Sequence, residues 1–586
     1  MIRRFGPLAS AASLLLVLCG AALTVGAQRT SSQTAPPDVI LTNGRFITVD
    51  RAFSRAEAAA ITGGRFVAVG TTAEIDRLKG PSTRSIDLHG RSVVPGLGDN
   101  HLHNAGGGPG IALSGARSLD DVYRAIAARV NQSEPGELLV SNSDWHEAQL
   151  REQRLPLRRD LDRVAPANPV VLVRGGHEYI LNSAALRKWN IGEQTPEPAG
   201  GRISRYDDKT LNGELVDRAR NLVALPPPPP RTIEERIAAQ AAEYRTLHAS
   251  GLTSVRHPGI SPDDYRVLQE MQRRGLLTMR VNALLRPDRE LDAPAVSAYL
   301  ANSGVRPDEG DAWLRIGGVK LAIDGGFEGG FMRDPYLEPW GEGGTYRGLQ
   351  TVPAARYTAI VRAINAAGWR VATHAVGDAA IDQVLDAYEA ADRDRSIRGR
   401  RWSIEHAFIA RADHFPRMRA LGLAISAQDH LYLAGPSLLQ YWGKERTASM
   451  TPMRTFIDQG LMVSAGTDSS VVPFPPLWVL YHFITRDTIS GGVIGPEQRI
   501  TREEALRAST MGNASLTFEE EAKGSIEPGK LADLVVLSED ILSCPEERIE
   551  SAKVLLTMVG GKVVYAGEEF PAEVTGSSSS STSAQP

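Results

Sequence analysis

The stretch Val93-Val94-Pro95-Gly96-Leu97-Gly98-Asp99-Asn100-His101-Leu102-His103 organises the interpretation of the whole chain. Its apolar run stops at a proline and glycines, and His101 and His103 then stand one residue apart. Side chains at i and i+2 of an extended chain point to the same face, so the two imidazoles can meet at one point at the strand's end. This spacing predicts a metal site, with two histidines in a surface loop as the plainer alternative.

Downstream of this stretch, apolar runs alternate with amphipathic helical patterns. That alternation is typical of a parallel sheet with crossover helices. Gly251 shows how the units join, because a glycine ends one helix and a buried strand begins at Thr253. The set fits an α/β fold of the TIM-type β/α barrel, predicted over residues 93–515. The predicted strands are 92–97, 253–256, 279–283, 314–323, 370–373, 402–404, 424–427 and 462–465.

Short strands separated by glycine turns are predicted near both ends of the chain. Gly560-Gly561 has the composition of a hairpin turn. We expect residues 38–92 and 516–570 to close one small composite β-sandwich domain. The predicted strands of this domain are 38–41, 44–49, 65–70, 532–537, 554–559 and 562–565.

The segment 118–231 is too long for one crossover between barrel strands. It combines a helical pattern at 119–130 with strand-like runs that include 170–173 and a hairpin pattern around Gly200. We therefore predict an insertion over the barrel mouth. The run of prolines at 226–230 would form a stiff spacer into the next helix.

The N-terminal segment has the features of an export signal. Two early arginines precede an apolar stretch, and the small residues Val25 and Ala27 suit a signal peptidase. We expect a cleaved signal peptide over 1–27, a polar linker over 28–37, and a periplasmic or secreted protein. An uncleaved membrane anchor is the alternative.

The composition restricts the kinds of partner. Lys+Arg 65 against Asp+Glu 69 gives a net charge of -4, and no basic block is interleaved with aromatic residues, so we expect no nucleic acid. We expect a small-molecule substrate and no stable membrane insertion after signal cleavage. Assembly into a homo-oligomer is possible on this composition. The mature chain would keep only Cys544 and form no internal disulfide. The serine-rich residues 571–586 predict a disordered tail.

Lys320 lies inside one of the most apolar predicted strands, 314–323. Burial disfavours the charged form of a lysine and lowers its pKa. A neutral amine can react with carbon dioxide to give a carbamate, which is able to bridge two metal ions. A lysine paired with Asp324 or another carboxylate is an equally good interpretation of this feature alone.

Three further candidates stand at the ends of later strands. His374 and His406 end two consecutive strand–helix units, which favours metal ligation over two structural histidines. Asp468 ends the last predicted strand, where it can cap a helix or exchange a proton with a metal-bound water. Asp378 is better explained as a cap of the helix after His374.

Together these residues resemble the amidohydrolase superfamily in its two-metal, carboxylated-lysine form. The resemblance covers nearly the whole mature chain and includes boundary segments at 93–96 and 524–536. Residues 174–177, 182–186 and 320–326 resemble the branch that contains N-substituted formamide deformylase. The residues that carry the superfamily resemblance are His101, His103, Lys320, His374, His406 and Asp468.

The resemblance implies a centre of two divalent metal ions, with zinc expected. The implied ligands of the more buried ion are His101, His103 and Asp468. The outer ion would be held by His374 and His406, with carbamylated Lys320 and a hydroxide bridging both ions.

The resemblance also suggests catalytic roles. Asp468 would accept the proton of the hydroxide and pass it to the leaving amine. His177 is the candidate for orienting the substrate carbonyl or stabilising the oxyanion, with a structural role in the insertion as the alternative. Gln428-Asp429-His430 departs from the more usual Gln-Pro-x-His, which leaves the role of His430 open. An apolar pocket could be formed by Trp145, Tyr179, Phe327, Trp340 and Phe474.

The expected function is that of a metal-dependent hydrolase that cleaves a non-peptide carbon–nitrogen bond, of amide or formamide type, in a small molecule such as a hydrophobic amide. One alternative is a one-metal deaminase or an ester- or lactone-cleaving hydrolase on the same barrel. The segment 373–378 offers no glutamate proton shuttle, and Lys320 is present, which disfavours the deaminase. Another is a catalytically inactive exported binding protein, although every expected ligand type is present.

Overall fold

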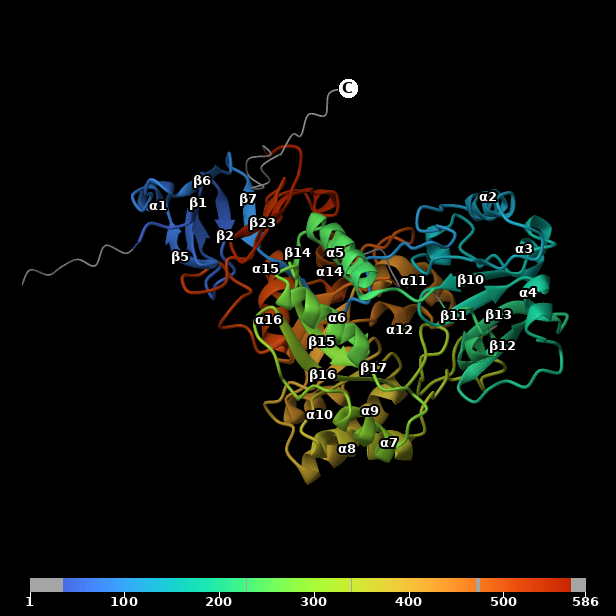
Figure 1. Cartoon of the computed structure of the whole chain (residues 1–586). Helices are drawn as coiled ribbons and strands as arrows, with labels where there is room; N and C mark the ends of the chain where they lie inside the picture. The colour runs from blue at the N-terminus through green and yellow to red at the C-terminus, as the bar shows by residue number, and fades with distance from the viewer. Residues whose placement is uncertain (1–34, 228, 339, 471–474, 571–586) are drawn as a thin grey trace, which may run out of the picture. The chain divides into compact units, whose positions relative to one another are not determined.

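The computed structural model describes residues 35–570, apart from 228, 339 and 471–474 (Figure 1). The predicted signal peptide, most of the predicted linker and the serine-rich tail lie outside the described residues. From Pro37 onward the described chain forms one compact unit. Within the part of the chain that is described, no helix has both the length and the apolar character needed to cross a bilayer.

The centre of this unit is a sheet of eight strands. They are β8 (Leu97–Asp99), β14 (Leu252–Ile260), β15 (Arg280–Leu285), β16 (Leu314–Ala322), β17 (Val371–Ala375), β18 (Ser403–His406), β19 (Ala424–Gln428) and β20 (Met462–Gly466). They pair in sequence order and in parallel from β8 to β20. The N–H of Asn100, just after β8, donates to the carbonyl of Ala465 in β20 at 3.3 Å, which brings the two edge strands together. The predicted TIM-type barrel is confirmed.

Helices surround this sheet, and the apolar faces of most of them share one hydrophobic core with the strands. Helix α5 begins with a capping box in which Thr232 and Glu235 satisfy each other's backbone N–H groups. The helices are α5 (Ile233–Ala249), α6 (Pro262–Arg273), α7 (Ala293–Ala301), α8 (Ala354–Ala366), α9 (Asp378–Asp394), α10 (His414–Leu421), α11 (His430–Tyr441), α12 (Lys444–Ala448), α13 (Met453–Asp458), α14 (Pro476–Thr485), α15 (Arg502–Arg507) and α16 (Asn513–Leu516).

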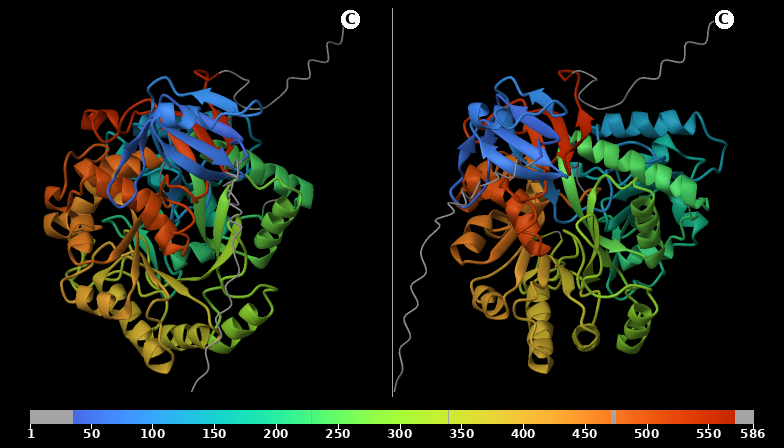
Figure 2. Two further views of the ribbon diagram at one scale, coloured as in Figure 1. Left: turned by 90° about the vertical axis from the view of Figure 1, so that its left-hand side faces the viewer. Right: turned by 60° about the vertical axis from the view of Figure 1, so that its left-hand side comes forward.

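Both ends of the described chain contribute to a two-sheet sandwich beside the barrel (Figure 2). Its elements are β1 (Val39–Thr42), β2 (Arg45–Ile47), β3 (Arg55–Ala56), β4 (Ala58–Thr62), β5 (Arg65–Gly70), α1 (Thr72–Asp76), β6 (Arg84–Asp87), β7 (Ser92–Pro95), β21 (Leu534–Leu537), β22 (Val554–Val559) and β23 (Lys562–Ala566). The sheets have the orders β5-β4-β1-β6 and β23-β22-β21-β7-β2-β3. Phe46 and Val93 from the first part pack with Leu534 and Val536 from the second, so neither part has a complete core alone.

The first predicted barrel strand, 92–97, is wrong as a single element. Its first half is β7, which pairs with β2 and β21 in the sandwich, and only the residues from Leu97 onward join the barrel as β8. Gly96 lies between the two, where only glycine fits without a shift, because a Cβ at this position would lie 2.2 Å from Oγ1 of Thr253. An apolar run looks the same in sequence whichever sheet it enters, so the pattern could not divide this one.

The insertion carries a five-stranded sheet and three helices. They are α2 (Leu119–Val130), β9 (Leu139–Val140), α3 (Arg158–Val164), β10 (Val170–Arg174), β11 (Glu178–Leu181), α4 (Ser183–Lys188), β12 (Gly201–Arg205) and β13 (Leu211–Asp217). The hairpin expected around Gly200 is β12–β13. Figures 1 and 2 show the insertion on the side of the barrel away from the sandwich. Tyr441 of α11 donates to Glu147 of the insertion at 2.7 Å, so the two are joined by a buried hydrogen bond.

Candidate active site

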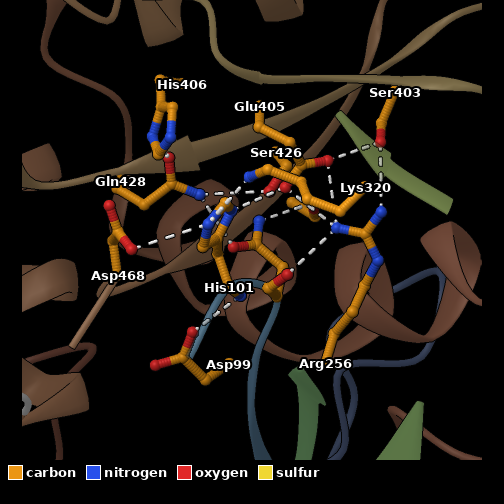
Figure 3. A network of polar contacts seen from close by, with 12 residues as sticks. Asp99, His101, Arg256, Lys320, Ser403, Glu405, His406, Ser426, Gln428 and Asp468 are labelled. Atoms are coloured by element: carbon orange, nitrogen blue, oxygen red, sulfur yellow. Dashed lines mark hydrogen bonds and ion pairs between the residues drawn. The ribbon is translucent and has the colours of Figure 1, made fainter. Parts of the chain in front are cut away.

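Five barrel strands place the predicted metal ligands at one edge of the sheet. His101 and His103 follow β8, Lys320 and His374 lie in β16 and β17, His406 ends β18, and Asp468 follows β20. The carboxyl ends of parallel barrel strands meet at the same rim, which is where active sites of this fold lie. Figure 3 shows Lys320, His406 and Asp468 gathered around His101.

Asp468 faces the two histidines of the opening stretch. Its Oδ1 lies 3.5 Å from Nε2 of His101 and 3.2 Å from Nε2 of His103. Two ligands bound tetrahedrally to one zinc ion at 2.0–2.1 Å stand about 3.3 Å apart, so these separations suit a shared ion. Asp468 Oδ1 is buried and accepts no hydrogen bond from any described residue. The N–H of Asp468 donates to the carbonyl of His101 at 2.7 Å, which ties the two segments together.

Two of these residues have a strained backbone. His406 has a φ of 72° and Asp468 a φ of 56°, both in the left-handed region that residues with a Cβ seldom adopt. Such conformations cost about 1–3 kcal/mol each and persist where the surroundings impose them, as at ligand-binding sites. Both occur where a strand ends and its last side chain turns toward the cluster.

Glu405 supports His101 from inside the barrel. Its Oε2 lies 2.6 Å from Nδ1 of His101, and Nη1 of Arg256 donates to both of its oxygens at 3.0 Å (Figure 3). Burial alone would raise the pKa of Glu405, but Arg256 and His101 hold it well below its usual range. The carboxylate therefore fixes the Nδ1–H tautomer of His101 and leaves its Nε2 lone pair free for a metal.

The hydrogen-bond partners of His374 and His406 show which ring nitrogen carries the hydrogen. His406 Nδ1 lies 2.7 Å from the side-chain oxygen of Gln428, and His374 Nε2 lies 3.0 Å from the carbonyl of Gly325. Both partners can only accept, so these nitrogens carry the hydrogen. Burial lowers the pKa of both imidazoles well below the usual range, which keeps them neutral. Each ring thus retains one lone pair, and the ring centroids are 4.5 Å apart.

Lys320 is buried without a counter-ion. Its Nζ lies 3.1 Å from Nε2 of His101, and among the described residues no carboxylate lies within 4.0 Å of it. Asp324, the alternative partner suggested by the sequence, instead accepts from the backbone N–H groups of Phe331, Val376 and Gly377. Burial lowers the pKa of Lys320 to about 7. A sizeable neutral fraction follows at neutral pH, as carbamate formation requires.

His430 joins the cluster, although the sequence left its role open. Its Nε2 lies 3.2 Å from Oδ2 of Asp468. A ring nitrogen of His406, a ring nitrogen of His430 and a carboxylate oxygen of Asp468 lie close enough together to bind one metal ion. His430 stands at the first residue of α11, and its ring is 5.7 Å from that of His406. It therefore contacts the carboxylate of Asp468 directly.

His177 reaches the same cavity from the insertion. Its Nδ1 lies 2.6 Å from Oδ1 of Asp217, and its ring stacks on that of His374 at 5.3 Å. Asp217 is a buried residue at the end of β13. The insertion thus supplies a histidine whose orientation is set by a carboxylate and whose other nitrogen is available to a ligand.

Two cavities meet at the cluster and share His177, His374, His406 and Asp468. The first has an empty volume of about 420 Å³ and an apolar lining that includes Trp145, Phe327, Val376 and Phe408. The second has about 710 Å³ and a polar lining that includes His101, His103, Lys320, Arg286 and Arg289. A ligand at the cluster can therefore extend into an apolar space on one side and a cationic one on the other.

Several predictions about the surroundings need correction. Tyr179 and Trp340 do not line the cavities, since Tyr179 stacks under Arg220 and Trp340 packs on Tyr441. Phe474 lies outside the described residues. Asp378 is not the N-cap of α9, because Gly377 holds that position and the Asp378 side chain pairs with Arg411.

The sequence did not reveal the roles of Glu405, Gln428 and Asp217, which orient the histidines, or of Arg256, which holds Glu405. A charged residue inside a buried parallel strand, as Glu405 is, was the available signal, because such a group must find a partner. Gln428 and Asp217 gave no comparable signal. Whether either residue orients a histidine depends on which other strand end lies next to it in the folded barrel.

The residues present fit a divalent metal centre. An unpaired buried carboxylate oxygen on Asp468, neutral histidines with one free nitrogen each, and carboxylate or amide groups on their other nitrogens are the features of such sites. His101, His103 and Asp468 offer one set of convergent ligand atoms, and His406, His430 and Asp468 offer a second.

The barrel, the rim position and this donor set define a metal-dependent hydrolase of the β/α-barrel class. The model of the amidohydrolase family matches residues 84–565. The chain therefore belongs to the amidohydrolase family, and it is a hydrolase that acts on carbon–nitrogen bonds. The sequence-based assignment to this superfamily is confirmed.

Individual relatives span nearly the full chain. N-substituted formamide deformylase of Arthrobacter pascens is 29% identical over 90% of this chain and 98% of its own. Protein LONG AFTER FAR-RED 3 of Arabidopsis thaliana is 29% identical over 90% of this chain and 91% of its own. The crystal structure of an uncharacterized metal-dependent hydrolase from Pyrococcus furiosus is 26% identical, covers 86% of this chain and 100% of its own, and has a TM-score of 0.61.

Proposed function

We propose that this protein hydrolyses an amide- or formamide-type bond of a small molecule, using two divalent ions, zinc by preference, and a carbamylated Lys320. The formamide deformylase among its relatives supports this bond type. The observation that carries the proposal is the convergence of His101, His103 and the unpaired Oδ1 of Asp468 beside a buried lysine that forms no ion pair with any described residue.

The ligands divide into two groups. We assign His101, His103 and Asp468 to one ion, and His374 and His406 to the other, with carbamylated Lys320 between them. Divalent ions at such a site supply Lewis acidity, which activates water near neutral pH and polarises a substrate carbonyl.

Asp468 is placed to move the proton. Burial would raise the pKa of Asp468, but His101, His103 and His430 hold it well below its usual range. It is therefore ionised and can accept a proton from the attacking water. From the same position it can return the proton to the departing amine nitrogen, since the cavities meet at this carboxylate.

We assign contact with the carbonyl oxygen of the substrate to His177. Asp217 holds Nδ1 and so fixes the orientation of the ring, and from a protonated ring Nε2–H would donate to an oxygen that gains negative charge. His177→Asn should therefore lower kcat more than it raises KM. Arg174 and Phe327 line the same cavity.

Metal analysis tests the centre. The purified protein should carry close to two divalent ions per chain, and Lys320→Ala should lose activity together with one ion. Lys523→Ala is the matched control, because Lys523 is another buried lysine but pairs with Glu519 at 2.8 Å. Normal metal content in the Lys320→Ala protein would exclude the bridging role.

A substrate screen tests the reaction. N-formyl, N-acyl and cyclic amides should be turned over, with apolar groups on the nitrogen preferred because the first cavity is lined by Trp145, Phe327 and Phe408. Turnover of esters or lactones alone, or release of ammonia from an amino-substituted ring, would refute the proposal. We also propose export, on the pattern of residues 1–27, and the mass of the mature chain from the producing cells tests it.

A further inference from the structure

Two arginines in the polar cavity form no ion pair within the described part of the chain. Arg286 and Arg289 line the same cavity as His101, His103 and Asp468. Among the described residues, no carboxylate lies within ion-pair distance of either guanidinium group, although their neighbours Arg218 and Arg356 both approach Glu290. Burial, with Arg286 as a second cause, lowers the pKa of Arg289 only to about 10, so it stays cationic at neutral pH.

The backbone of this segment is fixed while its guanidinium groups are left free. Arg286 directly follows β15, and its N–H donates to the carbonyl of Ile260 at 3.2 Å. Nη2 of Arg356 donates to the carbonyl of Arg289 at 2.9 Å. Gly259 leaves room for the Arg286 side chain, since a Cβ there would lie 2.9 Å from its Cδ. These contacts hold the loop in place and do not use either cationic head group.

Holding two like charges in one partly enclosed cavity is unfavourable unless an anion joins them. Asp468 attracts Arg286 and Asp217 attracts Arg289 at longer range. Neither carboxylate pairs with a guanidinium group, because Asp468 faces three histidines and Asp217 faces His177. A ligand that extends from the cluster into this cavity can supply the missing charge. Guanidinium groups bind oxyanions through paired, charge-assisted hydrogen bonds.

We propose that Arg286 and Arg289 form a subsite for an oxyanion on the substrate, so that the preferred substrate is an amide with an apolar group for one cavity and a carboxylate or phosphate-type group for the other. This inference rests on the proposed amide hydrolysis. It adds a class of substrate that a wholly apolar pocket would not select.

Two substrates that differ only in the carboxylate test the subsite. N-formylphenylalanine and N-formylphenethylamine share the formyl group and the phenyl ring. Each of Arg286→Gln and Arg289→Gln should lower kcat/KM for the anionic compound about 10- to 100-fold, mainly through KM, and change the neutral compound less than about threefold. Replacement by lysine should restore part of the loss, because the charge remains.

Arg306→Gln is the control for a loss of positive charge, because its side chain is 85% exposed and lies outside both cavities. It should leave both substrates unaffected. Equal losses on the anionic and the neutral substrate in the Arg286 and Arg289 variants would overturn the subsite and assign the arginines to support of the cluster.

Equilibrium binding to the metal-loaded protein separates failure of the subsite from failure of the proposed reaction. Calorimetry should show 3-phenylpropionate binding at least about tenfold more weakly to the glutamine variants, and 3-phenylpropionamide binding unchanged. A parallel titration uses 2-phenylethylphosphonate in place of 3-phenylpropionate. Whichever of the two binds more tightly identifies the anionic group that the subsite prefers. If no amide is hydrolysed but anion binding depends on the arginines, the oxyanion subsite is supported and the proposed amide hydrolysis is refuted. If neither substitution changes the affinity for the anion, the proposed subsite is wrong.

Discussion

Replacing Glu405 with glutamine should weaken the metal centre without touching a ligand. Oε2 of Glu405 accepts from Nδ1 of His101 at 2.6 Å and from Arg256 at 3.0 Å, while Oε1 accepts from Arg256 and from the hydroxyl of Ser403 at 2.5 Å. Glutamine has the same shape but one oxygen and one NH2 group. Whichever way it turns, an N–H donor now faces another donor, and the charge opposite Arg256 is lost.

The expected loss of stability depends on the hydrogen bonds that Arg256 retains in the variant. Breaking a buried ion pair by removing one partner costs about 3–5 kcal/mol. Arg256 still donates to the carbonyl of Asn100 and the hydroxyl of Ser403, each at 3.2 Å, so we expect a loss of folding stability near the lower end, about 3 kcal/mol. Loss of the carboxylate behind His101 should also weaken metal binding about 10- to 100-fold.

The assay has two parts, measured on Glu405→Gln and on the control Ser403→Ala. Chelator competition gives the metal dissociation constant, and urea unfolding of the metal-free protein gives the stability. Ser403→Ala removes the hydrogen bond that the hydroxyl donates to Oε1 and the one that it accepts from Arg256, but no charge. It should therefore cost about 1–2 kcal/mol and leave metal affinity within about threefold. If Glu405→Gln binds metal as tightly as the parent and loses less than about 1 kcal/mol, the proposed role of Glu405 is refuted.

Two further predictions concern packing and pH. Gly466→Ala should lower the free energy of unfolding by about 1–3 kcal/mol, measured by thermal unfolding, because its Cβ would lie 2.3 Å from side-chain oxygens of both Asp99 and Asn100. Gly115→Ala is the control and should be tolerated, because a Cβ there meets nothing within 4 Å. His482 is buried in α14, and burial, together with Arg486, lowers its pKa to about 3. The unfolded chain, with a pKa near 6.5, then binds a proton first as the pH falls. Stability from this residue is therefore present above pH 6.5 and decreases below it, by about 2 kcal/mol at pH 5. His482→Gln should lose correspondingly less stability between pH 7 and pH 5 in urea unfolding, and an unchanged pH dependence would contradict the assignment.

The sequence alone determined the barrel and the principal ligand residues. Alternating apolar runs indicate strands and helices because burial on both faces of a parallel strand leaves a continuous apolar run. His101, His103, Lys320, His374, His406 and Asp468 could be selected because ligand-type side chains at strand ends are recognisable locally. Rim placement then follows from the fold class.

The tertiary structure decided what these residues touch. The partners of His101 and His406 are Glu405 and Gln428, which lie 304 and 22 positions away in the chain, and no local pattern relates such pairs. The apolar run at 92–97 divides between two sheets, with Gly96 packed closely against Thr253 at the division.

Local periodicity records how much of a segment is buried, and so the sequence determined the strands, the helices and the chemistry available at their ends. Which carboxylate orients which imidazole, and which arginines remain without a partner, depend on contacts between distant segments. Those contacts are set by packing of the whole chain, and only the folded structure decided them.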